Sequence, residues 1–410
     1  CDKGDAQQRA LKKRYGLNAI HNWDSVKAHH IRGSYCVLSG SPCPAFSKAG
    51  AKGGWSDPRS RYYPLQFRSA TECNTPVLLA ENVEEVLEEM PTGRYTGTTG
   101  HNDKMSPYNA LKQELEKWGY TVKYRCLDAG QVGGNTRRPR VIVQAHSKAQ
   151  VQDLQQRVTD RQQFLQEHGL ELSHDMDDDN FIWPKHGPVV SNIAHLLDPW
   201  CSVPDSYKLP FRRWGEFGIK QDNFNGVKRW GLRPNDNGIG KFTDANRLNA
   251  ADYGIAPGMT AAGNTGWYTS FKAGKKGASK FGIRRLQGHE CLRIAGFTEK
   301  HSLDLADGSR DPSFTESERF EMANNAICVE LSRAIFKGVR AYYDTEWFKG
   351  QIKEQERLHP EWERETELAK ARTMPRHEPR QQTTQDSPYN SDEEEEDESR
   401  LDVETGTLGT

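Results

Sequence analysis

The chain of 410 residues carries 56 basic and 57 acidic side chains, so its formal net charge at pH 7 is only −1. This near-zero net charge is the sum of two parts of the chain with opposite charge. Residues 344–410 hold 19 acidic and 9 basic residues and leave a net charge of about +9 on residues 1–343, which suits a nucleic-acid partner. Eight cysteines without a Cys-x-x-Cys pair argue against a metal site and for a reducing, intracellular compartment, which would be the nucleus in a eukaryote. No apolar run approaches the ~20 residues that span a membrane.

The first predicted elements are a helix over residues 7–15 and a buried parallel strand over residues 35–38. Small residues and a proline end the strand, so Cys43 lies just past its carboxyl end. A lone cysteine is usually an inert, partly buried thiol. The following residues 48–61, which include Arg59, are basic and glycine-rich. This composition favours a mobile loop that closes over DNA phosphates, although a solvated surface loop has the same composition.

Two later stretches predict further reactive groups at the same sheet edge. An apolar strand from Pro76 ends at Glu81 and continues into a helix-like segment up to Met90. After an amphipathic helix over residues 106–118, two strands over residues 124–128 and 141–144 enclose a loop with Arg138 and Arg140. Reacting groups collect at the carboxyl ends of strands in open α/β sheets. We therefore expect thiol, carboxylate and guanidinium groups to converge.

The alternation of strands and helices fades from about residue 150 to residue 280. A helix predicted over residues 157–168 precedes an acidic patch at residues 175–179 and short pieces rich in Trp, Gly and Pro. Cations mix with aromatics and glycines in residues 226–233, which include Lys228 and Arg229, and in residues 268–280, as in nucleic-acid-binding loops.

A strong helical pattern returns over residues 320–343, with Leu331, Ile335 and Phe336 on one face. The remaining residues start as a charged helix near residues 351–371 and end as a disordered acidic tail with the unbroken acidic run 392–398. Such a run is usually a solvated tail, and it could also bind a protein partner.

Five motifs in this order resemble the DNA (cytosine-5) methyltransferase family. Ser-Pro-Cys43, Glu81-Asn82-Val83 and Arg138-Pro-Arg140 are similar to its Pro-Cys loop, Glu-Asn-Val strand end and Arg-x-Arg loop. Residues 284–297 (RRLQGHECLRIAGF) and residues 324–327 (NNAI) resemble its two later motifs.

The resemblance implies an α/β fold: a Rossmann-like, S-adenosylmethionine-dependent methyltransferase sheet with an inserted, smaller target-recognition domain. It assigns residues 1–149 to an N-terminally incomplete catalytic domain and residues 150–280 to the target-recognition region. Residues 281–343 would be the return of the catalytic domain, and residues 344–410 the charged helix and disordered acidic tail.

The resemblance also implies a covalent mechanism on DNA. Cys43, as a thiolate, would add to C6 of a flipped cytosine, so that C5 can take a methyl group from S-adenosylmethionine. Glu81 would hydrogen-bond N3 as an acid, which requires a desolvated pocket in which the acid keeps its proton. Arg138 and Arg140 would hold the base and its phosphates.

Cofactor and DNA contacts follow from the same resemblance. The cofactor would contact Asp24, Pro42, Asn325 and Ala326, although a surface turn explains Asp24 equally well. Double-stranded DNA would contact Arg59, Lys228 and Arg229.

The sequence also departs from the family pattern. The family's Phe-x-Gly-x-Gly cofactor loop is not found, His289 replaces the usual Arg, and Asn324 replaces the usual Gly. Two alternatives therefore stay open. One is a tRNA cytosine-5 methyltransferase, whose characteristic Cys-Phe-Thr tripeptide this sequence lacks. The other is a non-catalytic DNA-binding relative.

Overall fold

The computed structural model describes most of the first 343 residues. The described residues are 4–16, 18, 25–31, 33–47, 53–92, 104–188, 193–198, 200–208, 221–224, 227–230, 248–250, 256–257, 267–273, 279–297, 310–343, 349–350 and 353. Residues 1–373 form one compact unit, and residues 374–410, none of which is described, form a second. Of the predictions above, Asp24 and nearly all of the tail from residue 344 lie outside the described residues.

A four-stranded mixed sheet, with strand order β1-β2-β7-β5, lies at the centre of the first unit. Strand β1 (Cys36–Ser39) runs parallel to β2 (Val77–Asn82), whereas β7 (Pro139–Ser147) is antiparallel to both β2 and β5 (Tyr120–Asp128). The four predicted strands are therefore present, and β5 and β7 extend beyond their predicted ends. The prediction that the first of them is buried is wrong, because β1 lies at the edge of the described sheet and its Leu38 is 38% exposed. Since β2 is apolar on both faces, its first four residues are almost completely buried.

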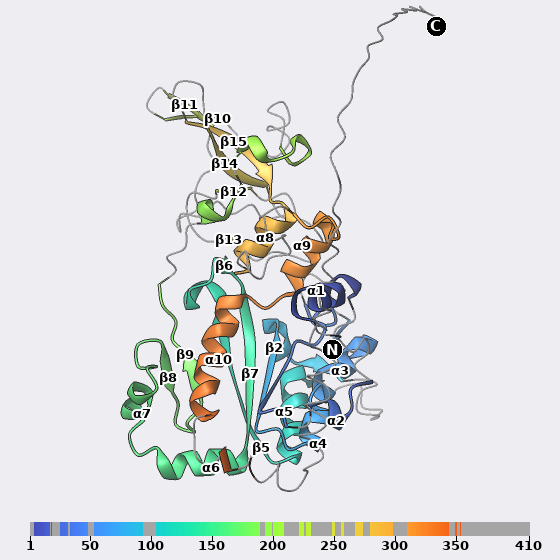
Figure 1. The fold of residues 1–410 in the computed structure, drawn as a ribbon, viewed down its shortest axis with the longest axis vertical. Helices are drawn as coiled ribbons and strands as arrows, with labels where there is room; N and C mark the ends of the chain where they lie inside the picture. Colours follow the sequence, from blue (N-terminus) through green and yellow to red (C-terminus); the bar gives the residue numbers. More distant parts are fainter. Residues whose placement is uncertain are drawn as a thin grey trace, which may run out of the picture. The chain divides into compact units, whose positions relative to one another are not determined.

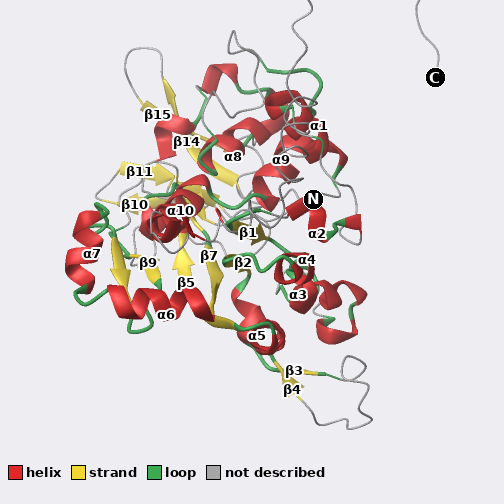
Figure 2. Cartoon of the chain, turned by 60° about the horizontal axis from the view of Figure 1, so that its bottom comes forward, coloured by secondary structure: helices red, strands yellow, loops and turns green. Residues whose placement is uncertain are grey.

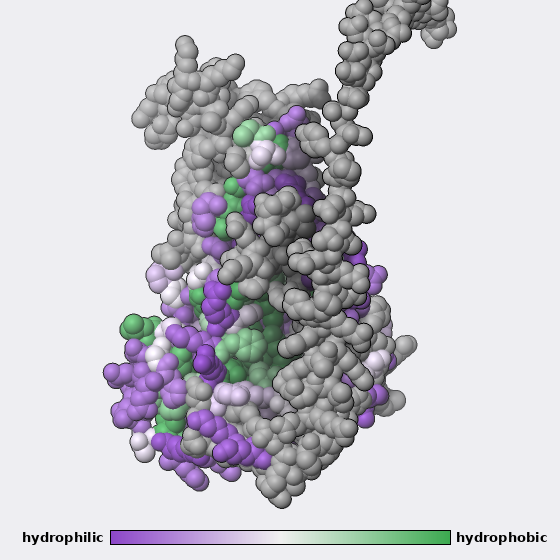
Figure 3. Space-filling model, in the orientation of Figure 1, coloured by the Kyte–Doolittle hydropathy of each residue, from purple (hydrophilic) through white to green (hydrophobic). Residues whose placement is uncertain are grey.

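Helices cover both faces of this sheet (Figures 1 and 2). On one face, α3 (Tyr62–Leu65), α4 (Arg68–Glu72) and α5 (Pro107–Lys117) pack against Leu78 and Ala80 of β2. On the other face, α6 (Lys148–Arg157) and α10 (Val329–Tyr343) pack against Val77 and Leu79. Alternate residues of one strand thus support two cores. Figure 3 shows hydrophilic residues gathered over α6 and α7 (Arg161–Glu167), at the lower left.

Shorter elements surround the sheet. They are α1 (Asp5–Tyr15), α2 (Ala28–Ile31), β3 (Met90–Pro91), β4 (Lys104–Met105), β6 (Thr136–Arg137), β8 (His174–Met176), β9 (Ile182–Pro184), α8 (Gly288–Ile294) and α9 (Glu316–Asn325). The helix predicted at the N-terminus is confirmed as α1. In the part of the chain that the structure describes, no helix is long and apolar enough to cross a membrane.

Three predicted helices differ from the observed ones. The helix predicted over residues 320–343 is two helices, because the chain leaves helical geometry at Ala326 (φ −71°, ψ 146°), and Phe336 is 40% exposed rather than on the buried face. The helix predicted after Glu81 is only a 3-10 turn, Glu84–Leu87, followed by β3. The helix predicted over residues 157–168 is the end of α6 and a separate α7, which Asp160 caps by accepting from the amides of Gln162 and Gln163.

The stretches predicted as basic loops in residues 226–280 contain strands. Strand β10 (Gln221–Phe224) pairs antiparallel with β11 (Val227–Trp230). Strands β12 (Leu248–Ala250), β14 (Trp267–Ala273) and β15 (Ser279–Arg285) form a three-stranded sheet, and β13 (Ala256–Pro257) pairs with β6. The prediction failed because glycines and lysines obscured the alternating pattern that identifies strands.

Candidate active site at the carboxyl ends of β1 and β2

The loop after β1 passes directly along the end of β2. Ser39 pairs with Ala80, so Gly40, the first residue after β1, follows the last pair on one side and Glu81, the next residue of β2, follows it on the other. A Cβ atom on Gly40 would lie 3.7 Å from Glu81 Oε2, so the loop passes close to this carboxylate. The parallel pairing thus delivers the two chain segments to one edge of the sheet, as the sequence predicted.

Asn82 fastens this loop to β2. Its Nδ2 donates to the carbonyl oxygen of Ser41 at 3.0 Å and is 3.2 Å from Ser41 Oγ. Its Oδ1 accepts from the amide of Val83 at 2.9 Å, and the side chain is only 2% exposed. Sequence reasoning placed Asn82 in a motif without assigning it a role. The structure gives it the role of holding the Pro-Cys loop.

Cys43 lies half-buried in a tight turn. Its carbonyl oxygen accepts from the amides of Phe46 and Ser47, each at 2.9 Å. Burial raises the pKa of the Cys43 thiol; the charge of Arg140 lowers it, and the charge of Glu81 raises it. The pKa is raised on balance, so the free protein holds a neutral thiol. The nearby guanidinium supplies the attraction that favours a thiolate.

Glu81 and Arg140 form an ion pair beside this thiol. Arg140 Nε lies 2.7 Å from Glu81 Oε1, and the two side chains are 18% and 13% exposed. Strand β7 is antiparallel to β2, so its first residues lie at the carboxyl end of β2, where Asn82 pairs with Val141. Strand direction therefore explains why Arg140, far along the chain, meets Glu81.

Arg138 is held from behind by α9. Its side chain is 6% exposed, and its Nη2 donates to the carbonyl oxygen of Asn324. Burial lowers the pKa of Arg138 to about 10. Among the described residues, Arg138 Nε and the side-chain atoms Oδ1 and Nδ2 of Asn324 have no hydrogen-bond partner, although they are buried. The resemblance gave Arg138 the role of holding substrate, but here its side chain is anchored in the protein.

The residues expected at the cofactor belong to two chain segments, one next to Arg138 and one next to Cys43. Asn325, the exposed last residue of α9, and the half-buried Ala326 directly follow the carbonyl group that Arg138 contacts, and Pro42 is exposed beside Cys43. Amide and backbone groups of this kind, next to buried unpartnered polar atoms, fit the amino-acid end of S-adenosylmethionine.

Arg59 lies near the thiol but is paired locally. Its Nη2 is 2.6 Å from Asp57 Oδ2, and this bond is the main cause that raises the pKa of Arg59. A thiolate at Cys43 would raise the pKa of Arg59 as well, so the two groups are within electrostatic reach. The described part of the predicted loop, residues 53–61, forms two 3-10 turns (Gly54–Ser56 and Pro58–Arg61) anchored by Trp55, and residues 48–52 lie outside the described residues. Trp55 is 6% exposed, and its Nε1 donates to Met105 at 2.8 Å.

Lys228 and Arg229 lie on strand β11. They pair with Asn223 and Asp222 of β10, and their side chains are outside the described part of the structure.

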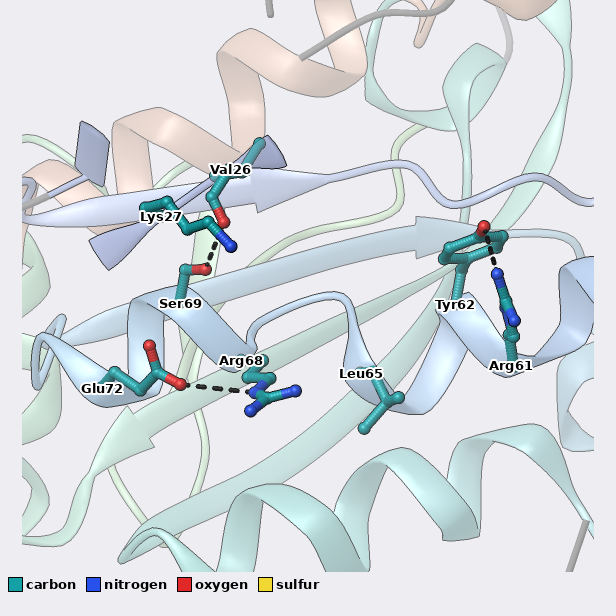
Figure 4. A pocket seen from close by; sticks show the side chains of 8 residues that line it. All are labelled: Val26, Lys27, Arg61, Tyr62, Leu65, Arg68, Ser69 and Glu72. Atoms are coloured by element: carbon teal, nitrogen blue, oxygen red, sulfur yellow. Dashed lines mark hydrogen bonds and ion pairs between the residues drawn. The ribbon is translucent and has the colours of Figure 1, made fainter. Parts of the chain in front are cut away.

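A separate hollow of about 420 Å³ lies along α3 and α4 (Figure 4). No motif in the sequence indicated it. Three cations and one acid line it, and three interactions join residues of the lining: Ser69 Oγ donates to the carbonyl oxygen of Val26, Arg68 pairs with Glu72, and Arg61 donates to the hydroxyl of Tyr62. Neither Cys43 nor Glu81 lines this hollow. Its lining residues are Val26, Lys27, Arg61, Tyr62, Leu65, Arg68, Ser69 and Glu72.

Comparisons with known proteins agree with this arrangement. The model of the family "C-5 cytosine-specific DNA methylase" matches residues 5–341. The Type II methyltransferase M.Bsp6I of Bacillus sp. (strain RFL6) is 21% identical over 337 residues, which cover 81% of this chain and 86% of the relative. The methyltransferase EhMeth of Entamoeba histolytica has the same fold, with a TM-score of 0.51 at 14% identity over 84% of this chain and 88% of that chain. The Dnmt2 methyltransferase of S. pombe gives 0.50 at 13% identity over 84% and 90%. The chain belongs to the family of C-5 cytosine-specific DNA methylases.

Proposed function

We propose that this protein is an S-adenosylmethionine-dependent DNA (cytosine-5) methyltransferase that acts through a covalent adduct of Cys43. The observation that carries the proposal is the meeting of a thiol, a carboxylate and a guanidinium at one sheet edge. Arg140 lies 2.7 Å from Glu81, and the charges of both act on Cys43. The Type II methyltransferases that resemble this chain favour DNA as the substrate.

The reaction requires a cytosine that has left the base stack, because C6 is inaccessible inside the duplex. The Cys43 thiol first loses its proton to solvent, the thiolate sulfur then forms a bond to C6, and the electron pair displaced from the C5–C6 double bond makes C5 nucleophilic. Glu81, which forms an ion pair with Arg140 in the free protein, would have to take up a proton as the base binds in order to donate a hydrogen bond to N3, and Arg140 would orient this side chain. S-adenosylmethionine, when bound, supplies the methyl group. Loss of the C5 proton to a base then breaks the C6–S bond and releases Cys43.

The rest of the chain supplies binding. Asn325 and Ala326 would hold the cofactor together with Pro42 and Asp24. A DNA phosphate could displace Asp57 from Arg59, whose guanidinium lies at the surface. Residues 150–280, with Lys228 and Arg229, would read double-stranded DNA, and the acidic tail could bind a protein partner.

Covalent trapping tests this proposal. The full chain is mixed with S-adenosylmethionine and duplex DNA that carries 5-fluorocytosine, whose fluorine cannot leave as a proton does. We expect a denaturant-stable adduct that is absent in Cys43→Ser and present in Cys201→Ser, which removes an exposed cysteine elsewhere. Equal or stronger trapping on tRNA would favour the tRNA substrate instead. DNA binding without any adduct would favour the non-catalytic alternative.

A further inference from the structure

The chain segments before and after strands β10 to β15, which we call the recognition strands, meet at one carboxylate. Asp198 lies between two 3-10 turns, Ile193–Leu196 and Trp200–Ser202, before the first of these strands, and α8 begins three residues after the last strand, β15. Asp198 Oδ2 is 2.6 Å from His289 Nε2, and Oδ1 is 2.7 Å from Arg293 Nη1. The amide of Asp198 donates to Glu290 Oε1 at 2.7 Å. We call Asp198 and its α8 partners the neck cluster.

His289 also faces a second carboxylate across the neck cluster. Its Nδ1 is 3.6 Å from Glu316 Oε2 on α9, within ion-pair range but too long for a hydrogen bond. The His289 side chain is only 4% exposed. The other titratable and charged groups around it are Glu290 and Arg293 on α8, Arg310 in the segment before α9, and Arg319 on α9.

The protonation state of His289 decides how well these contacts are satisfied. A neutral imidazole can donate from only one nitrogen, so a ring that donates to Asp198 turns the lone pair of Nδ1 toward Glu316. A protonated ring donates from both nitrogens and carries a charge between two carboxylates. Burial alone lowers the pKa of His289, but the contacts with Asp198 and Glu316 outweigh it and raise this pKa above its ordinary value.

We propose that His289 makes the neck cluster a proton-dependent clasp that fastens the base of the recognition region to α8 and α9. The regulatory part of this inference rests on the proposed role of residues 150–280 in reading DNA. The clasp is complete at pH values below the titration of His289, and its stabilisation is lost as the pH rises through that titration. The recognition strands are then oriented less firmly, and the affinity for DNA falls.

Hydrogen exchange of the Asp198 amide reports the clasp directly, because that amide donates to Glu290 within the neck cluster. After correction for intrinsic exchange, we expect its protection in the full chain to fall about threefold or more between about pH 6 and about pH 9. His289→Arg, whose guanidinium stays charged, should remove this dependence, and His289→Gln should lower the protection at every pH. Constant protection in the unmodified chain, or unchanged dependence in His289→Arg, would overturn the proposal.

Proton NMR of the histidine rings provides a second measurement that does not depend on how an arginine fits. The His289 ring should titrate above the ordinary value of about 6.5, and Asp198→Asn should move its titration down. His174, whose Nε2 donates to the carbonyl oxygen of Ala334 on α10, should titrate identically in both proteins. A His289 titration at or below the ordinary value would overturn the clasp.

The affinity for duplex DNA tests whether the clasp affects DNA binding, separately from whether the clasp exists. Between the same two pH values, the Kd of the unmodified chain should rise about threefold more than that of His289→Arg. Equal changes would overturn the regulatory part of the proposal. Absence of DNA binding at every pH, with protection that still titrates, would refute the DNA-reading role and leave the clasp supported.

Discussion

The hydrogen bonds of Asn82 predict that Asn82→Ala separates folding from reactivity at the active-site loop. The change removes the bonds from Nδ2 to Ser41 and from Val83 to Oδ1, and it leaves a nearly buried site unfilled. Each buried hydrogen bond contributes about 1 kcal/mol net, and an unsatisfied partner adds about 1–2 kcal/mol. We therefore expect the free energy of unfolding to fall by about 2–4 kcal/mol.

Urea denaturation gives the stability of Asn82→Ala, and the rate of adduct formation with 5-fluorocytosine DNA gives its reactivity under conditions where the variant is folded. Because Asn82 holds the loop that presents Cys43, the rate should fall about tenfold or more. Gln66→Ala is the matched control. Gln66 is equally buried, and its Nε2 donates to the carbonyl oxygen of Tyr63 at 2.8 Å rather than to the loop.

The control should lose stability and keep its adduct rate. If Asn82→Ala reacts within about twofold of the unmodified chain, the loop does not depend on Asn82 and the reasoning is wrong. If Gln66→Ala slows the reaction equally, loss of general stability explains the effect instead.

Four further substitutions test the surroundings of the site. Arg140→Gln removes the cation that lowers the pKa of the Cys43 thiol, so the pH profile of iodoacetamide alkylation of Cys43 should move to higher pH. Glu81→Gln removes the anion that raises this pKa and should move the profile to lower pH. Profiles equal to that of the unmodified chain would contradict the charge assignment. Trp55→Ala should lower stability by about 3–5 kcal/mol in urea denaturation, since Trp55 is buried under the loop; a loss below about 1 kcal/mol would show that this anchor is unimportant. Gly288→Ala would place a Cβ atom 2.4 Å from a carbonyl oxygen of α9 and should cost about 1–3 kcal/mol or more, while an unchanged melting temperature would show that the two helices separate easily.

The catalytic edge of the sheet could be predicted from residues close together in the chain. The apolar runs before Cys43 and Glu81 identify β1 and β2 and the loops after them. Burial of β2 on both faces requires uninterrupted apolar residues, whereas β1 is only half-buried. The loop with Arg138 and Arg140 followed from the same pattern. The same pattern did not predict the strand lengths, the break between α9 and α10, or the strands of residues 221–285.

The side-chain contacts that complete the site join residues far apart in the chain, and local pattern carries no information about them. Only the pairing of β2 with β7 decides that Arg140 meets Glu81, and only the packing of α9 decides that Arg138 is anchored on Asn324. The sequence by itself determined the family and the reacting groups, because motif order and apolar runs are local properties. The tertiary structure decided how Asn82 holds the loop and how Asp198 gathers the neck cluster, because hydrogen-bond geometry exists only after distant segments have packed together.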